Sequence, residues 1–215
     1  MGVLSRLLRS GVREREHRRG AVHAAKALTP ALRWLAAAGL TLGLIAGAGA
    51  SAPLGRPDPA SEVRTALPEA RLGGATRFTV WGFDVYDAVL WTAPGFRPAQ
   101  WADRPFALEL RYLRNFDGDA IAERSLEEMR RAAPMTDDQR SQWLAAMKAV
   151  FPNVKKGDRL TGVYAPGVGA RFFHNGTASG TVSDAQFAQR FFAIWLGPRT
   201  SEPAMRDALL GPSTP

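Results

Sequence analysis

The pair Asn175-Gly176 is the strongest constraint that the sequence places on the fold. It separates two runs of strand-forming residues, 171–174 and 177–182. Both residues of the pair accept positive φ, so Asn-Gly at this spacing predicts a tight turn between two antiparallel strands. We therefore expect a β-hairpin over residues 171–182.

Strand-forming residues mark three further stretches. Residues 78–91 are rich in aromatic and β-branched side chains and are interrupted at Gly82, which predicts two short strands or one bent strand. Residues 106–113 alternate with a period of two, as a half-buried strand does. Residues 159–164 show the same strand-like composition. These stretches and the hairpin supply the strands of the predicted fold.

Helical periodicity marks the segments between and after these strands. A first helix is predicted over residues 122–133, where Pro134 ends it, and a second from near Thr136 to residue 151. Two more helices should follow residue 184 and residue 200, with the N-cap candidates Asp184 and either Thr200 or Ser201. The predicted fold class is therefore α+β, with a helix pair inserted between strands.

The N-terminal 50 residues are predicted to be a basic extension followed by a signal peptide. Residues 35–50 are apolar and uncharged, and Ala48, Ala50 and Ala52 offer small side chains for cleavage. A membrane span needs about 20 apolar residues, so a cleaved signal is favoured over an uncleaved anchor. We expect a periplasmic or otherwise exported protein, with membrane contact only through the leader during export.

A proline-rich segment separates this leader from the predicted folded domain. Residues 51–70 contain four prolines, which is typical of a linker. The expected organisation is therefore a leader over residues 1–50, a linker over residues 51–70 and one domain over residues 71–211.

The net charge of +8 does not indicate a nucleic-acid partner. Eight basic and two acidic side chains lie in residues 1–50, so the remainder carries 20 basic and 18 acidic side chains and is nearly neutral. A phosphate-binding surface requires an excess of cations on the folded part. We therefore expect no nucleic-acid binding.

The residue inventory excludes several kinds of site. The chain contains no cysteine, and His174 is the only histidine outside the leader, so thiolate sites and histidine-rich metal centres are ruled out. His174 adjoins the Asn-Gly turn and is read as an exposed hairpin residue rather than a general base. We predict neither a metal nor a cofactor.

Arg77 is the charged residue whose surroundings are least expected. It lies in the otherwise apolar segment RFTVWGFDVY, residues 77–86. By strand alternation its side chain either points to solvent or projects into a cleft that needs an anion. The pattern alone leaves both interpretations open.

Several short motifs, taken in order, resemble the chalcone isomerase-like family in its bacterial, exported branch. They span about 140 residues and include LGGATR at 72–77, VYDAVLW at 85–91, YAPGVG at 164–169, FFAIWLG at 191–197 and LLG at 209–211. The resemblance implies an open-faced β-sandwich, in which a large antiparallel sheet carries helices on one face and a cleft lies between them.

The resemblance also implies two kinds of function. Some members close a chalcone to a flavanone, others bind fatty acids, and both groups share an arginine whose position Arg77 fits. The polar residues of the enzymes fall here at Ile121, near Glu128 and near Ile194. A cleft that lacks those groups can hold an acid but has little to direct proton transfer.

Non-catalytic binding of a fatty-acid-like or other hydrophobic acid is therefore the favoured function. The expected ligand-binding residues are Arg77, Tyr86 and Tyr112, although Tyr112 also suits the core. The alternatives are a chalcone isomerase-type lyase acting on a phenolic substrate, and an envelope domain that is structural or binds a partner. The oligomeric state is not predicted.

Overall fold

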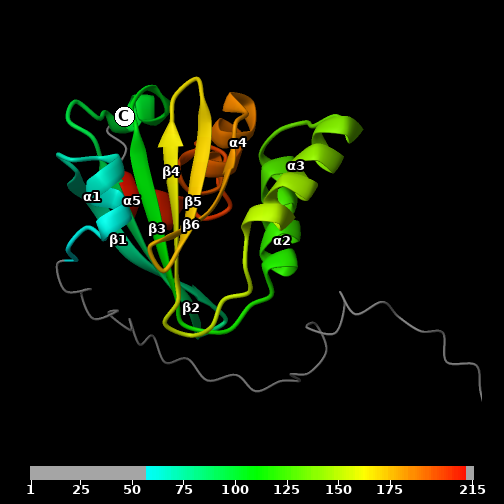
Figure 1. The fold of residues 1–215 in the computed structure, drawn as a ribbon, viewed down its shortest axis with the longest axis horizontal. Coiled ribbons are helices and arrows are strands. Elements are labelled where there is room, and N and C mark those ends of the chain that lie inside the picture. Colours follow the sequence, from blue (N-terminus) through cyan, green and yellow to red (C-terminus); the bar gives the residue numbers. More distant parts are fainter. Residues whose placement is uncertain (1–56, 212–215) are drawn as a thin grey trace, which may run out of the picture. The chain divides into compact units, whose positions relative to one another are not determined.

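A six-stranded antiparallel sheet forms the centre of the protein. The computed structural model describes residues 57–211. The strands are β1 (Arg71–Val80), β2 (Phe83–Thr92), β3 (Phe106–Tyr112), β4 (Arg159–Ala165), β5 (Gly169–His174) and β6 (Thr177–Val182). Each strand pairs with the next along the chain, in the order β1-β2-β3-β4-β5-β6 (Figure 1). The predicted antiparallel sheet is confirmed.

The predicted turn at Asn175-Gly176 and a second tight turn at Trp81-Gly82 both have positive φ. Asn175 and Gly176 have φ values of 50° and 89° between β5 and β6, as a two-residue hairpin turn with positive φ requires. Trp81 and Gly82 have φ values of 49° and 80° between β1 and β2. The segment interrupted at Gly82 is therefore two strands, and the first of them already begins at Arg71.

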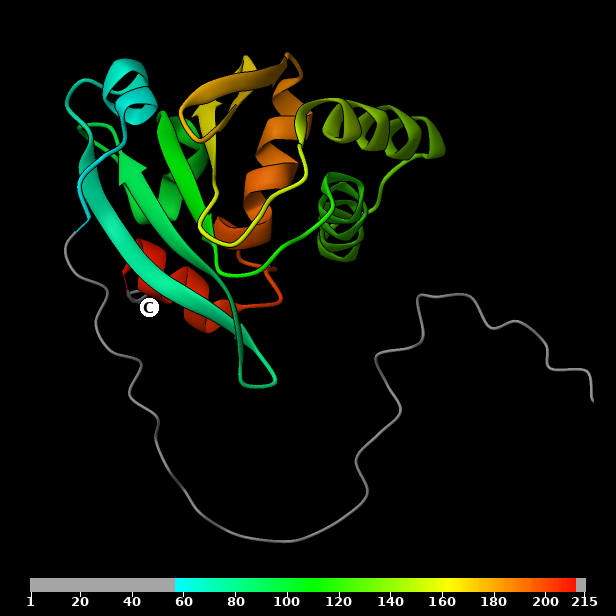
Figure 2. The same cartoon turned by 60° about the horizontal axis from the view of Figure 1, so that its bottom comes forward.

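Four helices cover one face of the sheet, here called the inner face. They are α2 (Gly118–Ala132), α3 (Asp137–Val150), α4 (Ala185–Leu196) and α5 (Pro203–Leu210). Figure 2 shows α4 and α5 lying along this face, with α2 and α3 as a pair beside α4. The inner face carries the main core, which includes Leu90, Phe106, Leu108 and Phe192.

The helix N-termini match the sequence predictions at two of three positions. Thr136 and Gln139 form a reciprocal capping box at α3, and Asp184 accepts a hydrogen bond from the Phe187 backbone N–H at 2.9 Å at α4. The prediction for α5 was wrong, because its N-cap is Glu202 rather than Thr200 or Ser201. The Thr200 hydroxyl instead accepts from the Glu202 backbone N–H, and Pro203 starts the helix.

A short helix covers the opposite, outer face of the sheet and corrects the predicted linker. Helix α1 (Ser61–Ala66) lies within residues 51–70, and its Val63 is fully buried. Val63 packs in a small cluster with outer-face residues of the sheet, among them Trp91 and Val163. The apolar side chains of this segment outweigh its prolines, so the folded part begins before Arg71.

The leader and the start of the linker fall outside the described residues, which begin at residue 57. The signal peptide, its cleavage site and the export of the protein therefore stay predictions. Within residues 57–211, no helix combines the length and apolar character needed to cross a membrane.

Helix α5 approaches β1 so closely that a side chain at Gly74 has no room. A Cβ atom built there would lie 2.2 Å from the carbonyl oxygen of Ala208 and 2.6 Å from that of Leu209. The Gly73-Gly74 pair is thus part of a strand, and Gly74 brings the C-terminal helix onto the inner face beside the site described next.

Candidate functional site

An apolar cavity lies between the inner face of the sheet and helices α2, α4 and α5. Its volume is about 270 Å³, near the lower end of the range typical of small-molecule sites. Aliphatic and aromatic side chains form most of its wall. Its sheet side includes Phe78, Val85, Tyr86, Leu108, Leu110, Tyr112, Leu160 and Phe172, and its helix side includes Ile121, Arg124, Ser125, Glu128, Phe191, Phe192, Ile194, Trp195, Ser201, Glu202 and Met205.

Tyr86 and Tyr112 both line this cavity, as neighbours on β2 and β3. Their rings meet edge to face with centroids 6.0 Å apart. The Tyr86 hydroxyl accepts a hydrogen bond from Trp195 Nε1 at 3.0 Å. The Tyr112 hydroxyl has no hydrogen-bond partner within residues 57–211, although the side chain is only 4% exposed. Because Tyr112 lines the cavity, this hydroxyl is available to a ligand or water there.

Burial controls the protonation of both tyrosines. It raises the pKa of Tyr86 and of Tyr112 well above the usual tyrosine value, because a buried phenolate would lose its hydration. Both hydroxyls are therefore neutral at physiological pH and can serve as hydrogen-bond donors.

A charged cluster lies at the α2 side of the cavity. Glu128 is 7% exposed, and its carboxylate accepts hydrogen bonds from Arg124 at 2.5 Å, Arg131 at 2.9 Å and Ser201 at 2.9 Å. Burial alone would raise the pKa of Glu128, but the hydrogen bonds from Arg131 and Ser201 and the two positive charges outweigh it and hold the pKa below its usual value. Glu128 is therefore ionised and fully engaged.

Arg124 is the one cation among the described residues that line the cavity. Its side chain is 70% exposed and also contacts Glu127 at 3.3 Å. Because Arg131 and Ser201 also hold Glu128, Arg124 is not the sole partner of that carboxylate. Its guanidinium can reorient toward an anion at the cavity without leaving Glu128 alone.

Arg77 lies on the other face of the sheet, which corrects the expectation that it enters the cleft. Its strand neighbour Phe78 lines the cavity, and successive side chains of a strand point to opposite faces. The Arg77 guanidinium bonds Asp87 at 2.7 Å and Asp84 at 2.9 Å, and it is absent from the cavity wall. Strand alternation, not the local apolar composition, decides its direction. His174 is likewise remote, at the end of β5 beside Asp158.

The sequence reasoning missed Arg124, although a signal for it was present. Ile121, Arg124, Ser125 and Glu128 recur at helical spacing and form one face of α2. The polar side chains of this face resemble those of a solvent-exposed face. The apolar stripe that contains Leu126 was therefore predicted to be the buried side of the helix. The resemblance had already indicated three positions on the cavity wall, because Ile121, Glu128 and Ile194 all line it.

Within residues 57–211, no group of three or more histidine, aspartate or glutamate side chains is arranged to hold a metal ion. Among the described residues, the polar groups that line the cavity are the hydroxyls of Tyr86, Tyr112, Ser125 and Ser201, the carboxylates of Glu128 and Glu202 and the guanidinium of Arg124.

Comparison with known proteins decides the family. Residues 62–211 match the sequence family described as chalcone isomerase-like. The chain belongs to the chalcone isomerase-like family. A solved structure of a fatty-acid binding protein from Arabidopsis thaliana superposes on this chalcone isomerase-like protein with a TM-score of 0.52, covering 66% of this chain and 86% of that one. The two are 11% identical, so this likeness concerns the fold.

A bacterial relative is similar at the level of sequence. An uncharacterized protein of Haemophilus influenzae is 31% identical over 132 residues, which are 61% of this chain and 63% of that protein. The match thus spans less than two thirds of the relative's length. The match carries no statement of activity.

Proposed function

We propose that this protein binds a fatty-acid-like or other hydrophobic acid in its inner-face cavity, without catalysing a reaction. The observation that carries the proposal is an apolar cavity with a single lining cation, Arg124, and one unpartnered hydroxyl, that of Tyr112. The likeness in fold to a fatty-acid binding protein supports the same ligand class.

The apolar wall supplies affinity in proportion to the ligand surface that it removes from water. Each buried CH₂ group contributes about 0.8 kcal/mol. Aromatic side chains from the sheet and from α4 form a large part of this wall, including Phe172, Phe191 and Trp195. Such a wall favours an alkyl or aromatic body, while the polar groups near α2 favour a polar head.

The acid head is assigned to Arg124 and Tyr112 instead of Arg77. Arg124 can donate charge-assisted hydrogen bonds to a carboxylate, and Tyr112 can donate from its hydroxyl. Glu128 and Glu202 also line the cavity and oppose a second negative charge. Arg131 and Ser201 reduce this opposition, because they hold the Glu128 carboxylate in place.

The pKa values of three groups that line the cavity favour binding over isomerisation. A general acid or base works best when its pKa lies near the working pH. The pKa values of Tyr86 and Tyr112 are raised away from neutrality, and that of Glu128 is lowered away from it. None of these three groups therefore has the proton affinity that the isomerase alternative requires.

A structural or partner-binding domain would expose Arg77 and would have no cavity behind it. Arg77 does lie on the outer face, but the cavity exists on the inner face of the same strands. This cavity favours ligand binding over a domain that is only a filled core.

Displacement of the fluorescent fatty acid 11-(dansylamino)undecanoic acid by palmitic acid tests the proposal. We expect palmitic acid to displace the probe. Arg124→Gln should lower the affinity for palmitic acid by about threefold to tenfold. This range lies between the loss of an exposed ion pair and the loss of a hydrogen bond to a charged group. Methyl palmitate has no acid group, and its affinity should not depend on Arg124.

Arg77→Gln is the matched control, because it removes a guanidinium outside the cavity. Its palmitic acid affinity should equal that of the wild type. No probe binding by the wild type would overturn the proposed function. Sensitivity to Arg77→Gln together with indifference to Arg124→Gln would overturn the assignment of the acid head.

A further inference from the structure

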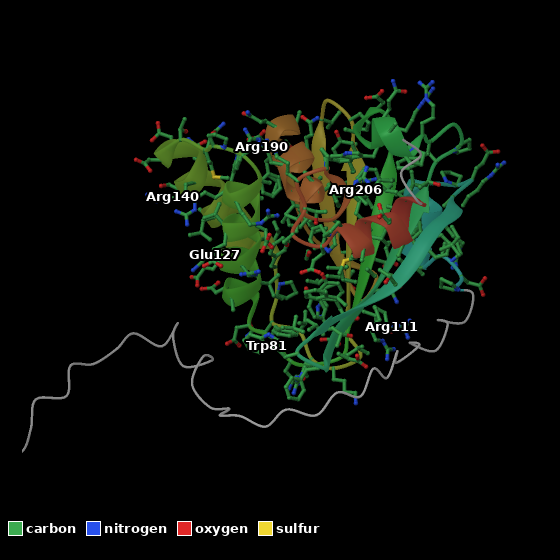
Figure 3. All side chains as sticks on the ribbon, turned by 180° about the vertical axis from the view of Figure 1, so that it is seen from behind. Trp81, Arg111, Glu127, Arg140, Arg190 and Arg206 are labelled. Atoms are coloured by element: carbon green, nitrogen blue, oxygen red, sulfur yellow. The ribbon has the colours of Figure 1, made fainter. Side chains whose placement is uncertain are left out.

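The turn between β1 and β2 exposes apolar side chains that the fold does not use. Within residues 57–211 four large apolar side chains are exposed, and three belong to this turn: Trp81 at 72%, Phe83 at 58% and Val80 at 37%. Figure 2 shows the β1–β2 hairpin projecting beyond the loops that join β3 to α2 and α3 to β4, and Figure 3 shows Trp81 at its end. We call residues 80–83 the hairpin tip.

A tryptophan at position 81 does not favour the folded state of this turn. It adopts a φ of 49°, in the left-handed region that favours glycine or asparagine. A bulky aromatic side chain is strained there, and at 72% exposure it gains little from packing. Strain and exposure at one residue point to a role outside the folded chain, since neither stabilises the fold.

Cations without acidic partners surround the hairpin tip. The Arg114 guanidinium lies over the Phe83 ring, with Cζ 4.8 Å from the ring centroid. Lys155 and Lys156 are exposed on the adjacent loop, where the Lys156 backbone N–H donates to the Asn115 side chain at 2.8 Å. None of these three cations forms an ion pair within residues 57–211.

The acidic side chains at this end are mostly engaged. Asp84 is paired with Arg77, and Asp158 accepts from Asn175 at 2.9 Å and lies 3.2 Å from Nε2 of His174. Asp117 is exposed and is the remaining acid of the loop after β3. This end of the protein therefore carries three cations without an acidic partner, namely Arg114, Lys155 and Lys156, and one exposed acid, Asp117, whose side chain has no partner within residues 57–211.

We propose that the hairpin tip docks on an anionic lipid surface, with its apolar residues inserted at the interface and the cations around it bound to lipid headgroups. Aromatic side chains favour the membrane interface, and lysine and arginine nearby are attracted to anionic lipids. This surface adds a second membrane contact to the one expected from the leader.

The docked geometry places the cavity beside the lipid. Phe78 on β1 and Val85 on β2 line the cavity, and each is two residues from the hairpin tip. Phe116, which follows Arg114 in the same loop, also lines it. The side of the cavity toward the hairpin tip is therefore the one nearest the membrane, where hydrophobic acids partition.

A fluorophore at a single introduced cysteine tests docking in the full chain, which has no cysteine of its own. The emission of an NBD dye attached to Val80→Cys should shift to the blue when vesicles containing about 30 mol% phosphatidylglycerol are added. Doxyl lipids in these vesicles should quench the dye. Val168→Cys carries the same label on an exposed turn at the other end of the strands and should do neither. Equal responses of the two labels would overturn the proposal.

Unlabelled variants give an independent readout by vesicle flotation. Trp81→Ser combined with Phe83→Ser should weaken binding by at least about tenfold relative to Val168→Ser. Arg114→Gln should weaken it by about fivefold in about 0.1 M sodium chloride and less in about 1 M, whereas Arg97→Gln should not. Residues 35–50 are present in every variant, so their contribution cancels. Binding that is indifferent to the tip variants would overturn the proposal and leave the acid-binding function untouched.

Discussion

Arg77 and Asp87 face each other across β1 and β2 and form a two-pronged ion pair, with Nε 2.7 Å from Oδ1 and Nη2 3.1 Å from Oδ2. Asp84 binds the same guanidinium at 2.9 Å. The pair lies on the outer face, whereas the neighbours Phe78 and Tyr86 face the cavity. Arg77 therefore links β1 to β2 near their connecting turn, and its side chain points away from the proposed ligand.

Removal of this ion pair should affect stability only weakly. The side chain of Arg77 is 34% exposed, and an exposed pair contributes less than about 1 kcal/mol. We expect Arg77→Gln to lower the free energy of unfolding by no more than that in urea titrations. A loss of several kcal/mol would mean that the hairpin depends on Arg77 in a way that its exposure does not indicate.

Tyr112→Phe should separate stability from ligand binding. The hydroxyl has no partner among residues 57–211, so its removal should leave the free energy of unfolding unchanged or raise it by about 1 kcal/mol. Palmitic acid affinity should fall by about threefold, because the ligand loses a donor. Tyr86→Phe is the matched control and should cost about 1 kcal/mol of stability, since Trp195 Nε1 loses its acceptor.

Glu109 should make the protein less stable as the pH rises. Burial raises the pKa of Glu109, with a further contribution from the charge of Glu62, while Arg159 opposes both. The folded state therefore holds this proton more tightly than the unfolded state, and stability falls as the pH rises from the ordinary glutamate pKa through the folded pKa. Glu109→Gln should exceed wild-type stability at pH 7 and lose that advantage near pH 4.

Glu62→Gln should show the opposite pH dependence. Burial works to raise the pKa of Glu62, but hydrogen bonds from its own backbone N–H, Thr161 and Arg159 bring it below the usual value. The ionised form then stabilises the fold above the ordinary glutamate pKa, and this stability is lost as the pH falls through the folded pKa. Thermal melts of Glu109→Gln and Glu62→Gln from pH 3 to pH 8 test both predictions. If the stability difference from the wild type changes with pH in the same direction for both variants, the assignment is contradicted.

Gly74→Ala should destabilise the protein by about 1–3 kcal/mol, the usual cost of overpacking. Its Cβ would meet the backbone carbonyls of Ala208 and Leu209, which cannot move without displacing α5. Gly73→Ala is the control, because its Cβ would meet side-chain atoms of Thr92 and Leu90 at 3.0 Å or more. If denaturant titrations show that Gly74→Ala lowers the free energy of unfolding less than Gly73→Ala does, the close approach of α5 to β1 is refuted.

Local patterns predicted most elements because each pattern has a local physical cause. Asn175 and Gly176 make their turn through their own backbone preferences, and Thr136 and Asp184 cap helices within three residues of themselves. Helix α1 was missed because its stability comes from long-range contacts. Glu62 pairs with Arg159, almost a hundred residues away, and this partner is invisible in the proline-rich local composition.

The sequence by itself determined the antiparallel α+β fold and its family, because strand alternation, helical spacing and turn residues act locally and the family motifs follow one another in order. It left open which face each charged residue takes. Only the tertiary structure placed Arg77 outside and Arg124 at the cavity, because the side of the sheet that the helices cover depends on packing between distant segments. The exposed Trp81 likewise became evident only once the rest of the apolar surface was buried.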